Sequence, residues 1–79
     1  MLAGMSKADL RQILAANLLA YRRRSGESQD EFAHRCGLHR TYVGSVERCE
    51  RNVTLATLEL FANATGISVA TLLTKDGVK

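Results

Sequence analysis

The chain has 79 residues, a formal net charge of +3 and 46% hydrophobic residues, with eight arginines, three lysines and no proline. This length suffices for one domain spanning residues 1–79, and the hydrophobic content excludes a chain that is disordered by composition. The uncharged stretch from Leu60 to Thr74 is too short to cross a bilayer, so we expect no membrane partner. The excess of arginine suits an anionic partner, because guanidinium groups bind phosphates and guanine edges in a fixed geometry.

The residues that usually carry catalysis or bind metals are too scattered to form a site. Cys36 and Cys49 have neither zinc-site spacing nor the pattern of a disulfide framework, so a reducing cytoplasm is the expected compartment. His34 and His39 are too isolated for a metal site, and no nucleophile–base pair is visible. We therefore expect no enzyme activity, no metal, no cofactor and no small-molecule substrate.

The spacing of apolar residues predicts helices and no strand. The first helix is expected over residues 7–24. Ser6 is its expected N-cap, with Asp9 three residues further along. Ser25-Gly26 ends this helix, because glycine tolerates the left-handed conformation that helix ends often adopt.

Four more helices are expected, each after a residue suited to capping. They are 29–36 after Ser28, 40–48 after His39, 55–65 after Thr54 and 69–73 after Ser68. The apolar face of the fourth helix should be formed by Leu55, Leu58, Phe61 and Ala62. Residues 74–79 are polar and are expected to fray. The sequence thus predicts a compact all-α fold of five helices, with its core within residues 7–73.

Residues 29–48 have the features of a helix-turn-helix. Two short helices that cross steeply need a small residue at their closest approach, where Ala33 lies, and a turn residue that accepts positive φ, which Gly37 provides. The inward positions are apolar, namely Phe32, Cys36, Leu38, Val43 and Val46. The outer face of the helix over 40–48 is expected to carry Arg40, Thr41, Ser45 and Arg48, with Tyr42 and Gly44 beside them.

The segment A-H-R-C-G-L-H-R-T-Y-V-G-S-V-E-R, with S-Q-D-E-F-A leading into it, resembles the helix-turn-helix of the phage-repressor-like (xenobiotic-response-element) regulators. The resemblance implies a lambda-repressor-like fold. Within that family, H-R-T-Y-V-G-S-V-E-R-C-E-R-N-V-T is similar to the controller proteins of restriction–modification systems. That similarity implies a homodimer that binds operator DNA and regulates its own promoter and that of a restriction gene. The chain departs from its relatives at Cys49, where they usually carry glycine, and at Glu27, where they usually carry an apolar residue.

The candidate DNA-binding residues lie on and around the third helix. Arg40, Thr41 and Tyr42 open this helix, which is the end that usually contacts base edges in the major groove. Ser45 lies on the same face as Thr41 and is expected to contact a base or a phosphate. The resemblance adds Gln29 as a phosphate clamp at the start of the second helix. It also adds Arg51 and Asn52, with help from Arg48, in the loop after the third helix.

Two further sets of residues have expected structural roles. The resemblance implies an ion pair between Arg22 and Glu47 that holds the third helix in place. Leu60 falls away from the core side of its helix, and the short fifth helix is crowded with apolar residues. The expected dimer interface therefore consists of Leu60, Val69, Leu72 and Leu73. In the alternative, Val69 and Leu72 complete the core of the monomer, as in monomeric relatives of the fold.

Other functions remain open at this stage. A phage-type repressor or an antitoxin-like autoregulator would have the same fold. A protein-interaction module that has lost DNA binding would lack basic and hydrogen-bonding side chains on the helix over 40–48. Arg40, Thr41 and Arg51 argue against that module.

Overall fold

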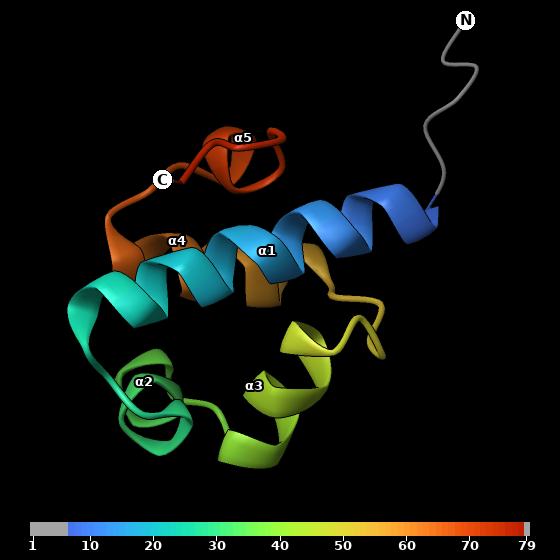
Figure 1. Cartoon of the computed structure of the whole chain (residues 1–79). Helices are drawn as coiled ribbons and strands as arrows, with labels where there is room; N and C mark the ends of the chain where they lie inside the picture. Colours follow the sequence, from blue (N-terminus) through green and yellow to red (C-terminus); the bar gives the residue numbers. More distant parts are fainter. Residues whose placement is uncertain (1–6, 79) are drawn as a thin grey trace, which may run out of the picture.

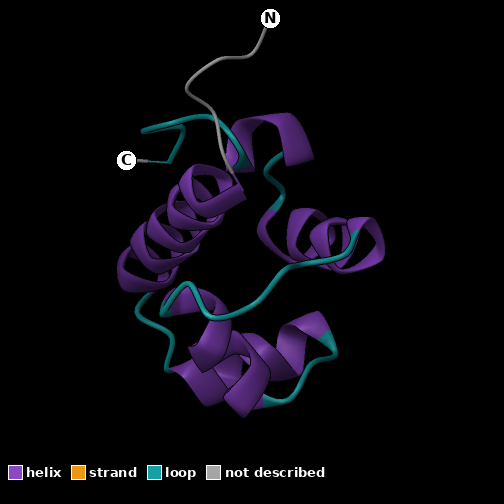
Figure 2. Cartoon of the chain, turned by 90° about the vertical axis from the view of Figure 1, so that its right-hand side faces the viewer, coloured by secondary structure: helices purple, strands orange, loops and turns teal. Residues whose placement is uncertain are grey.

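The computed structural model describes residues 7–78, with the side chains of residues 10–78. Its helices are α1 (Lys7–Ser25), α2 (Gln29–Cys36), α3 (Arg40–Glu47), α4 (Leu55–Thr65) and α5 (Val69–Leu72) (Figure 1). The residues between 7 and 78 form no strand (Figure 2), which confirms the all-α prediction. Ser6 and the side chain of Asp9, expected to cap α1, lie outside the described residues.

The helix boundaries follow the capping residues that the sequence offers. Ser28, Thr54 and Ser68 have extended backbones, and each side chain accepts a hydrogen bond from an amide in the first turn of the helix that follows. Ser28 also donates its backbone N–H to Glu31 at 2.8 Å, which completes the predicted capping box. At the start of α3, Nδ1 of His39 accepts from the amide of Thr41 at 3.1 Å. Local chemistry alone therefore fixes four helix starts.

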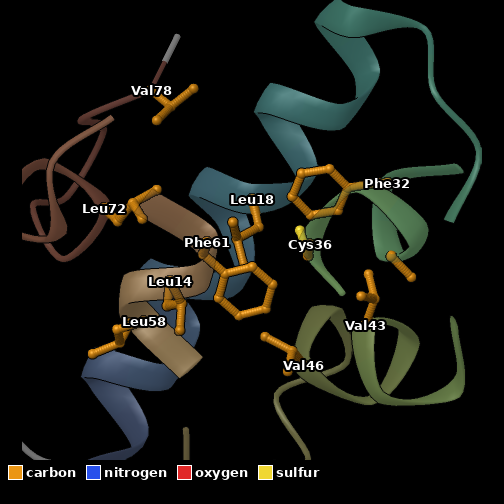
Figure 3. Packing of buried hydrophobic residues seen from close by; sticks show 11 residues of the cluster. Leu14, Leu18, Phe32, Cys36, Val43, Val46, Leu58, Phe61, Leu72 and Val78 are labelled. Carbon is orange, nitrogen blue, oxygen red and sulfur yellow. The ribbon is translucent and has the colours of Figure 1, made fainter. Parts of the chain in front are cut away.

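The core lies between α1, α4 and the α2–α3 pair. The rings of Phe32 and Phe61 stack at its centre with their centroids 6.1 Å apart (Figure 3). Leu18 of α1 and Val43 of α3 are fully buried in the same cluster. α3 packs against both α1 and α2, whereas α5 packs against α1 and α4 on the other side of the molecule (Figure 1). α3 is therefore held from behind by the hydrophobic core.

Leu55 does not belong to the core, and its predicted place on the apolar face of α4 is wrong. Its side chain is 79% exposed. The reason is positional, because Leu55 is the first residue of α4 and no preceding helical turn covers it. Leu58 and Phe61, further along the same helix, are buried as predicted.

The expectation that residues 74–79 fray is also wrong for the described part of this segment. Val78 is only 8% exposed and joins the hydrophobic core (Figure 3). The buried side chain of Asn17 in α1 donates to the carbonyls of Leu72 and Thr74 at 2.8 and 2.9 Å. Its Oδ1 atom accepts from the amide of Val78 at 3.2 Å. A buried asparagine thus fixes the chain after α5 onto α1, because it satisfies backbone groups that would otherwise need water.

Candidate DNA-binding surface

The turn between α2 and α3 has the geometry that a helix-turn-helix requires. Ala33 is almost fully buried where the two helices meet, and the amide of Leu38 donates to its carbonyl at 2.9 Å. Gly37 caps α2 with φ of 73°, a conformation that costs a residue with a side chain free energy. These features confirm the roles predicted for Ala33 and Gly37 and fix the crossing of the two helices.

α3 presents its first turn to solvent. Arg40 and Thr41 are exposed, whereas Val43 and Val46 point into the core. The first turn of α3 contains no acidic residue, so the positive potential of the helix N-terminus adds to the charge of Arg40. This end of α3 is therefore able to donate hydrogen bonds to a polyanion.

Glu47 joins α3 to both neighbouring helices. Arg22 of α1 donates to the two carboxylate oxygens, from Nε at 2.7 Å and from Nη2 at 3.0 Å. The side-chain amide of Gln29 donates to the same carboxylate at 2.9 Å. Burial of Glu47 opposes its ionisation, but the hydrogen bonds from Arg22 and Gln29 outweigh burial and hold its pKa below the ordinary value. The ion pair expected between Arg22 and Glu47 is present, and it fixes the end of α3.

The contact between Gln29 and Glu47 affects the phosphate-binding role that is expected for Gln29. One of the two protons of the Gln29 side-chain amide is already donated within the protein. Gly44 makes room for this arrangement, since a Cβ atom there would lie 3.3 Å from Oε1 of Gln29 and 3.1 Å from Nη1 of Arg48. The side chain of Gln29 is therefore preoriented by Glu47.

Ser45 does not lie on the exposed face of α3, and this part of the prediction is wrong. The residue is only 7% exposed. Its hydroxyl donates to the carbonyl of Tyr42 at 2.7 Å and accepts from Nε of Arg51 at 3.1 Å. The loop after α3 folds back and places the guanidinium of Arg51 4.9 Å from the centre of the Tyr42 ring. Arg51 therefore contacts both Ser45 and Tyr42, which precede it in the sequence.

The remaining predicted contacts lie in the exposed loop. Arg48 donates from Nε and Nη2 to the two oxygens of Glu50, both at 3.2 Å. Both side chains are more than half exposed, so this pair contributes little to stability and can open when a phosphate approaches. Asn52 is exposed close behind Arg51.

Comparison with known proteins agrees with this geometry. Residues 18–72 match the family model described as "Helix-turn-helix". The chain belongs to this family. Its members read DNA with the second helix of the motif, and this helix-turn-helix protein is a sequence-specific DNA-binding regulator of transcription, not an enzyme.

Two curated relatives and one solved structure are informative. The chain is 54% identical over 71 residues to "Control protein C.SmaI" from Serratia marcescens, covering 90% of this chain and 84% of the relative. It is 42% identical over 50 residues to "Control protein C.BamHI" from Bacillus amyloliquefaciens, covering 63% of this chain and 62% of the relative. The crystal structure of the hypothetical transcription factor NHTF from Neisseria has a TM-score of 0.83 and 40% identity, covering 96% of this chain and 88% of the other. The fold and the regulator class are therefore shown.

An ionic cluster at the far end of α2 was not predicted from the sequence. Arg35 donates to both carboxylate oxygens of Glu27, from Nε at 2.7 Å and from Nη2 at 2.8 Å. It also donates to the hydroxyl of Tyr21 at 3.0 Å and to the carbonyl of Ala64 at 2.7 Å. The hydrogen bond from Arg35 lowers the pKa of Glu27, against the opposing effect of burial. The ion pair with Glu27 thus joins α2 to the turn before it. The hydrogen bonds from Arg35 to Tyr21 and Ala64 tie α2 to α1 and α4.

The two cysteines have different environments. Cys36 is buried in the core, and burial raises the pKa of its thiol to about 11. Cys49 follows α3 with φ of 63°, a left-handed conformation that strains a residue with a Cβ atom. Its Sγ atom lies 3.9 Å from the carbonyl oxygen of Arg11. In the described part of the chain, no group of three or more histidine, cysteine or acidic residues is arranged to hold a metal ion.

The residues expected to form a dimer interface fall into two groups. Leu72 is fully buried in the monomer core, so its predicted place in an interface is wrong, while Val69 and Leu73 are half-buried. Leu60 is 40% exposed. A groove of about 380 Å³ lies beside α5 and is lined by Leu10, Arg11, Leu14, Asn52, Val53, Leu55, Leu58 and Leu73. None of the helices in the described range is both long enough and apolar enough to cross a membrane.

Proposed function

We propose that this chain is a control protein of a restriction–modification system that binds a palindromic operator as a homodimer in the bacterial cytoplasm. The observation that carries the proposal is the 54% identity to a protein named as a control protein, which extends over 90% of the chain. A second control protein is 42% identical over 50 residues. The identity accompanies a recognition helix whose exposed residues, Arg40 and Thr41, retain the chemistry for reading bases.

The recognition helix α3 enters the major groove in this proposal. Arg40, at its first position, donates two hydrogen bonds to O6 and N7 of a guanine. Thr41 contacts a neighbouring base or its phosphate. Gln29 and the first amides of α2 face the DNA backbone, where contacts fix the register but carry no sequence information.

The structure supports a dimer surface different from the predicted one. Leu10 and Leu55 are both exposed and line the groove beside α5, together with Leu73. The Nε atom of Arg11, which also lines the groove, is buried and has no hydrogen-bond partner among the described residues. A second copy of the chain would cover these apolar side chains and could supply an acceptor for Arg11. The groove is therefore the better candidate for the dimer interface.

Two rival functions share the fold. A phage-type repressor and an antitoxin would bind an operator in the same way. The neighbouring genes distinguish these functions from that of a control protein. A methyltransferase gene and an endonuclease gene beside this one would support the control protein, and a toxin gene would support the antitoxin.

DNA binding is measured first with duplex DNA from upstream of the gene, by fluorescence anisotropy at several salt concentrations. The slope of log K against log salt should be negative, with each neutralised phosphate adding about 0.9 to its size. Unrelated duplex of the same length serves as the control. Equal affinity for the two duplexes, or affinity that does not respond to salt, would contradict an operator-binding regulator.

The roles of Arg40 and Gln29 are separated by comparing two variants. Arg40→Ala should weaken operator binding by about 1–3 kcal/mol and relax the preference at one base pair in each half-site. Gln29→Ala should weaken binding to operator and random DNA to a similar extent, because phosphate contacts are the same on both. Lys75→Ala, which removes one exposed positive charge outside the α2–α3 unit, is the matched control. A loss of specificity in Gln29→Ala would mean that the two roles are assigned wrongly.

A further inference from the structure

The loop after α3 holds an arginine against the recognition helix. Nε of Arg51 donates to Oγ of Ser45 at 3.1 Å, and its guanidinium carbon lies 4.9 Å from the centre of the Tyr42 ring. One contact uses an edge of the guanidinium and the other uses its face. Together they restrict both the position and the tilt of the group.

The hydroxyl of Ser45 is itself oriented before it meets the arginine. Its proton is donated to the backbone carbonyl of Tyr42 at 2.7 Å, which leaves a lone pair of the oxygen for Nε of Arg51. Ser45 is 7% exposed, so water competes weakly for this hydrogen bond. The serine is therefore a fixed acceptor beneath the loop rather than a group available to DNA.

The far end of the Arg51 guanidinium remains available. Within residues 7–78, Nη1 and Nη2 of Arg51 make no hydrogen bond and the side chain forms no ion pair. Other arginines of the chain differ, since Arg22 and Arg35 are bound by carboxylates. Arg51 is thus an uncompensated cation held beside α3, and its two terminal amino groups have no partner within residues 7–78.

We infer that Tyr42 and Ser45 are positioning residues that orient Arg51, so that its two terminal amino groups bind a pair of acceptors on the operator. Such a pair is supplied by O6 and N7 of a guanine or by two phosphate oxygens. Ser45 acts on DNA only through Arg51 in this arrangement. The gain comes from preorganisation, because an arginine that is already ordered loses less side-chain entropy on binding. This inference rests on the proposed DNA-binding function and assigns Ser45 a role other than base contact.

A double-mutant cycle tests the inference on the full chain with operator duplex. Ser45→Ala should weaken binding about three- to tenfold, which corresponds to the ordering of one long side chain. In a chain that already carries Arg51→Ala, the same substitution should have no further effect. Ser45→Ala combined with Arg40→Ala is the matched control, and there the two effects should multiply because no contact joins these residues.

Two further measurements separate the possible acceptors. A decrease of about 0.9 in the salt slope of Arg51→Ala would indicate a phosphate, whereas a lost preference for guanine at one position would indicate a base edge. Tyr42→Leu should reproduce the effect of Ser45→Ala and should also vanish in the Arg51→Ala background. Circular dichroism of each variant checks that the helices remain folded.

The outcomes distinguish this inference from the function on which it rests. Wild-type protein that does not distinguish operator from random DNA would refute the proposed function. Wild-type protein that binds the operator, with Ser45→Ala and Arg51→Ala effects that multiply fully, would show that Ser45 acts independently and would overturn the positioning role. Loss of binding only in Arg51→Ala, with Ser45→Ala and Tyr42→Leu unchanged, would overturn it as well.

Discussion

Arg22 and Glu47, 25 positions apart in the sequence, form a bidentate ion pair that ties the last turn of α1 to the end of the recognition helix α3. Nη1 of Arg22 also donates to the carbonyl of Glu27 at 3.0 Å, so the same guanidinium fixes the turn before α2. A single side chain therefore aligns both helices of the helix-turn-helix against α1. The role of the pair lies in the geometry of the fold, because Glu47 itself would repel phosphate.

Glu47→Ala should lower the free energy of unfolding by about 2 kcal/mol, because it leaves the donors of Arg22 and Gln29 without their shared acceptor. Urea denaturation followed by circular dichroism measures the change. Glu59→Ala, on the exposed face of α4, is the matched control and should stay within about 0.5 kcal/mol of wild type. Equal effects of the two substitutions would show that the ion pair contributes no net stability.

The pH dependence of stability follows from the same carboxylate. The folded pKa of Glu47 lies below its ordinary value of 4.5, since hydrogen bonds from Arg22 and Gln29 outweigh the burial that opposes ionisation. A carboxylate with a lowered folded pKa contributes stability that is present above about pH 4.5 and is lost as the pH falls through the folded pKa. Wild type and Glu47→Gln should therefore differ in stability at pH 7 and converge below about pH 4.5. Stability curves that stay parallel down to pH 3 would contradict this linkage.

Asn17→Ala should destabilise the protein by about 2–3 kcal/mol, because the carbonyls of Leu72 and Thr74 and the amide of Val78 lose the partner that Asn17 supplies. In the Asn17→Ala variant, the amide of Val78 should exchange its hydrogen faster than the core amides of α3 do. Asn63→Ala, at an exposed position in α4, controls for the loss of an asparagine. Unchanged protection at Val78 would mean that packing alone holds the segment.

Cys49→Gly should be more stable than Cys49→Ala by about 1 kcal/mol, because only glycine adopts the left-handed backbone at this position without a Cβ penalty. Alanine keeps the strain at φ of 63° and removes the sulfur, so the pair of variants isolates the backbone term. Thermal unfolding at one pH measures both. If Cys49→Ala proves the more stable variant, the strained backbone is not what limits stability here.

The sequence predicts those parts of the fold that depend on neighbouring residues. Capping by Ser28, Thr54 and Ser68 needs only the next few positions, and the helix boundaries followed from it. Gly37 was predicted on the same ground, since the turn requires positive φ. The sequence therefore predicts the position of the recognition helix and of its exposed Arg40.

The parts that the sequence missed depend on which distant segments meet. Asn17 lies three residues after Leu14, at a core position of α1, and a buried asparagine at such a position signals a need for partners. Nothing in the sequence names Val78 as one of them. Ser45 was placed on the outer face by helical spacing, but the loop after α3 covers it through Arg51. Helical periodicity cannot predict such a fold-back, because the loop has no period.

Two exposed leucines of α4 distinguish the possible positions of the proposed dimer interface, because they point in different directions. Leu55 lines the groove beside α5 and Leu60 does not. Five residues of helix separate their directions by about 140°, so one flat interface buries at most one of them. If the chain forms the proposed dimer, Leu55→Glu should convert it to monomer with the helix content preserved, since a charge would have to be buried against the partner. Leu60→Glu is the matched control and should remain dimeric. Sedimentation equilibrium at micromolar concentration measures all three proteins. A dimer that survives Leu55→Glu and is lost in Leu60→Glu would place the interface on the other side of α4, and a monomeric wild type would refute the homodimer itself.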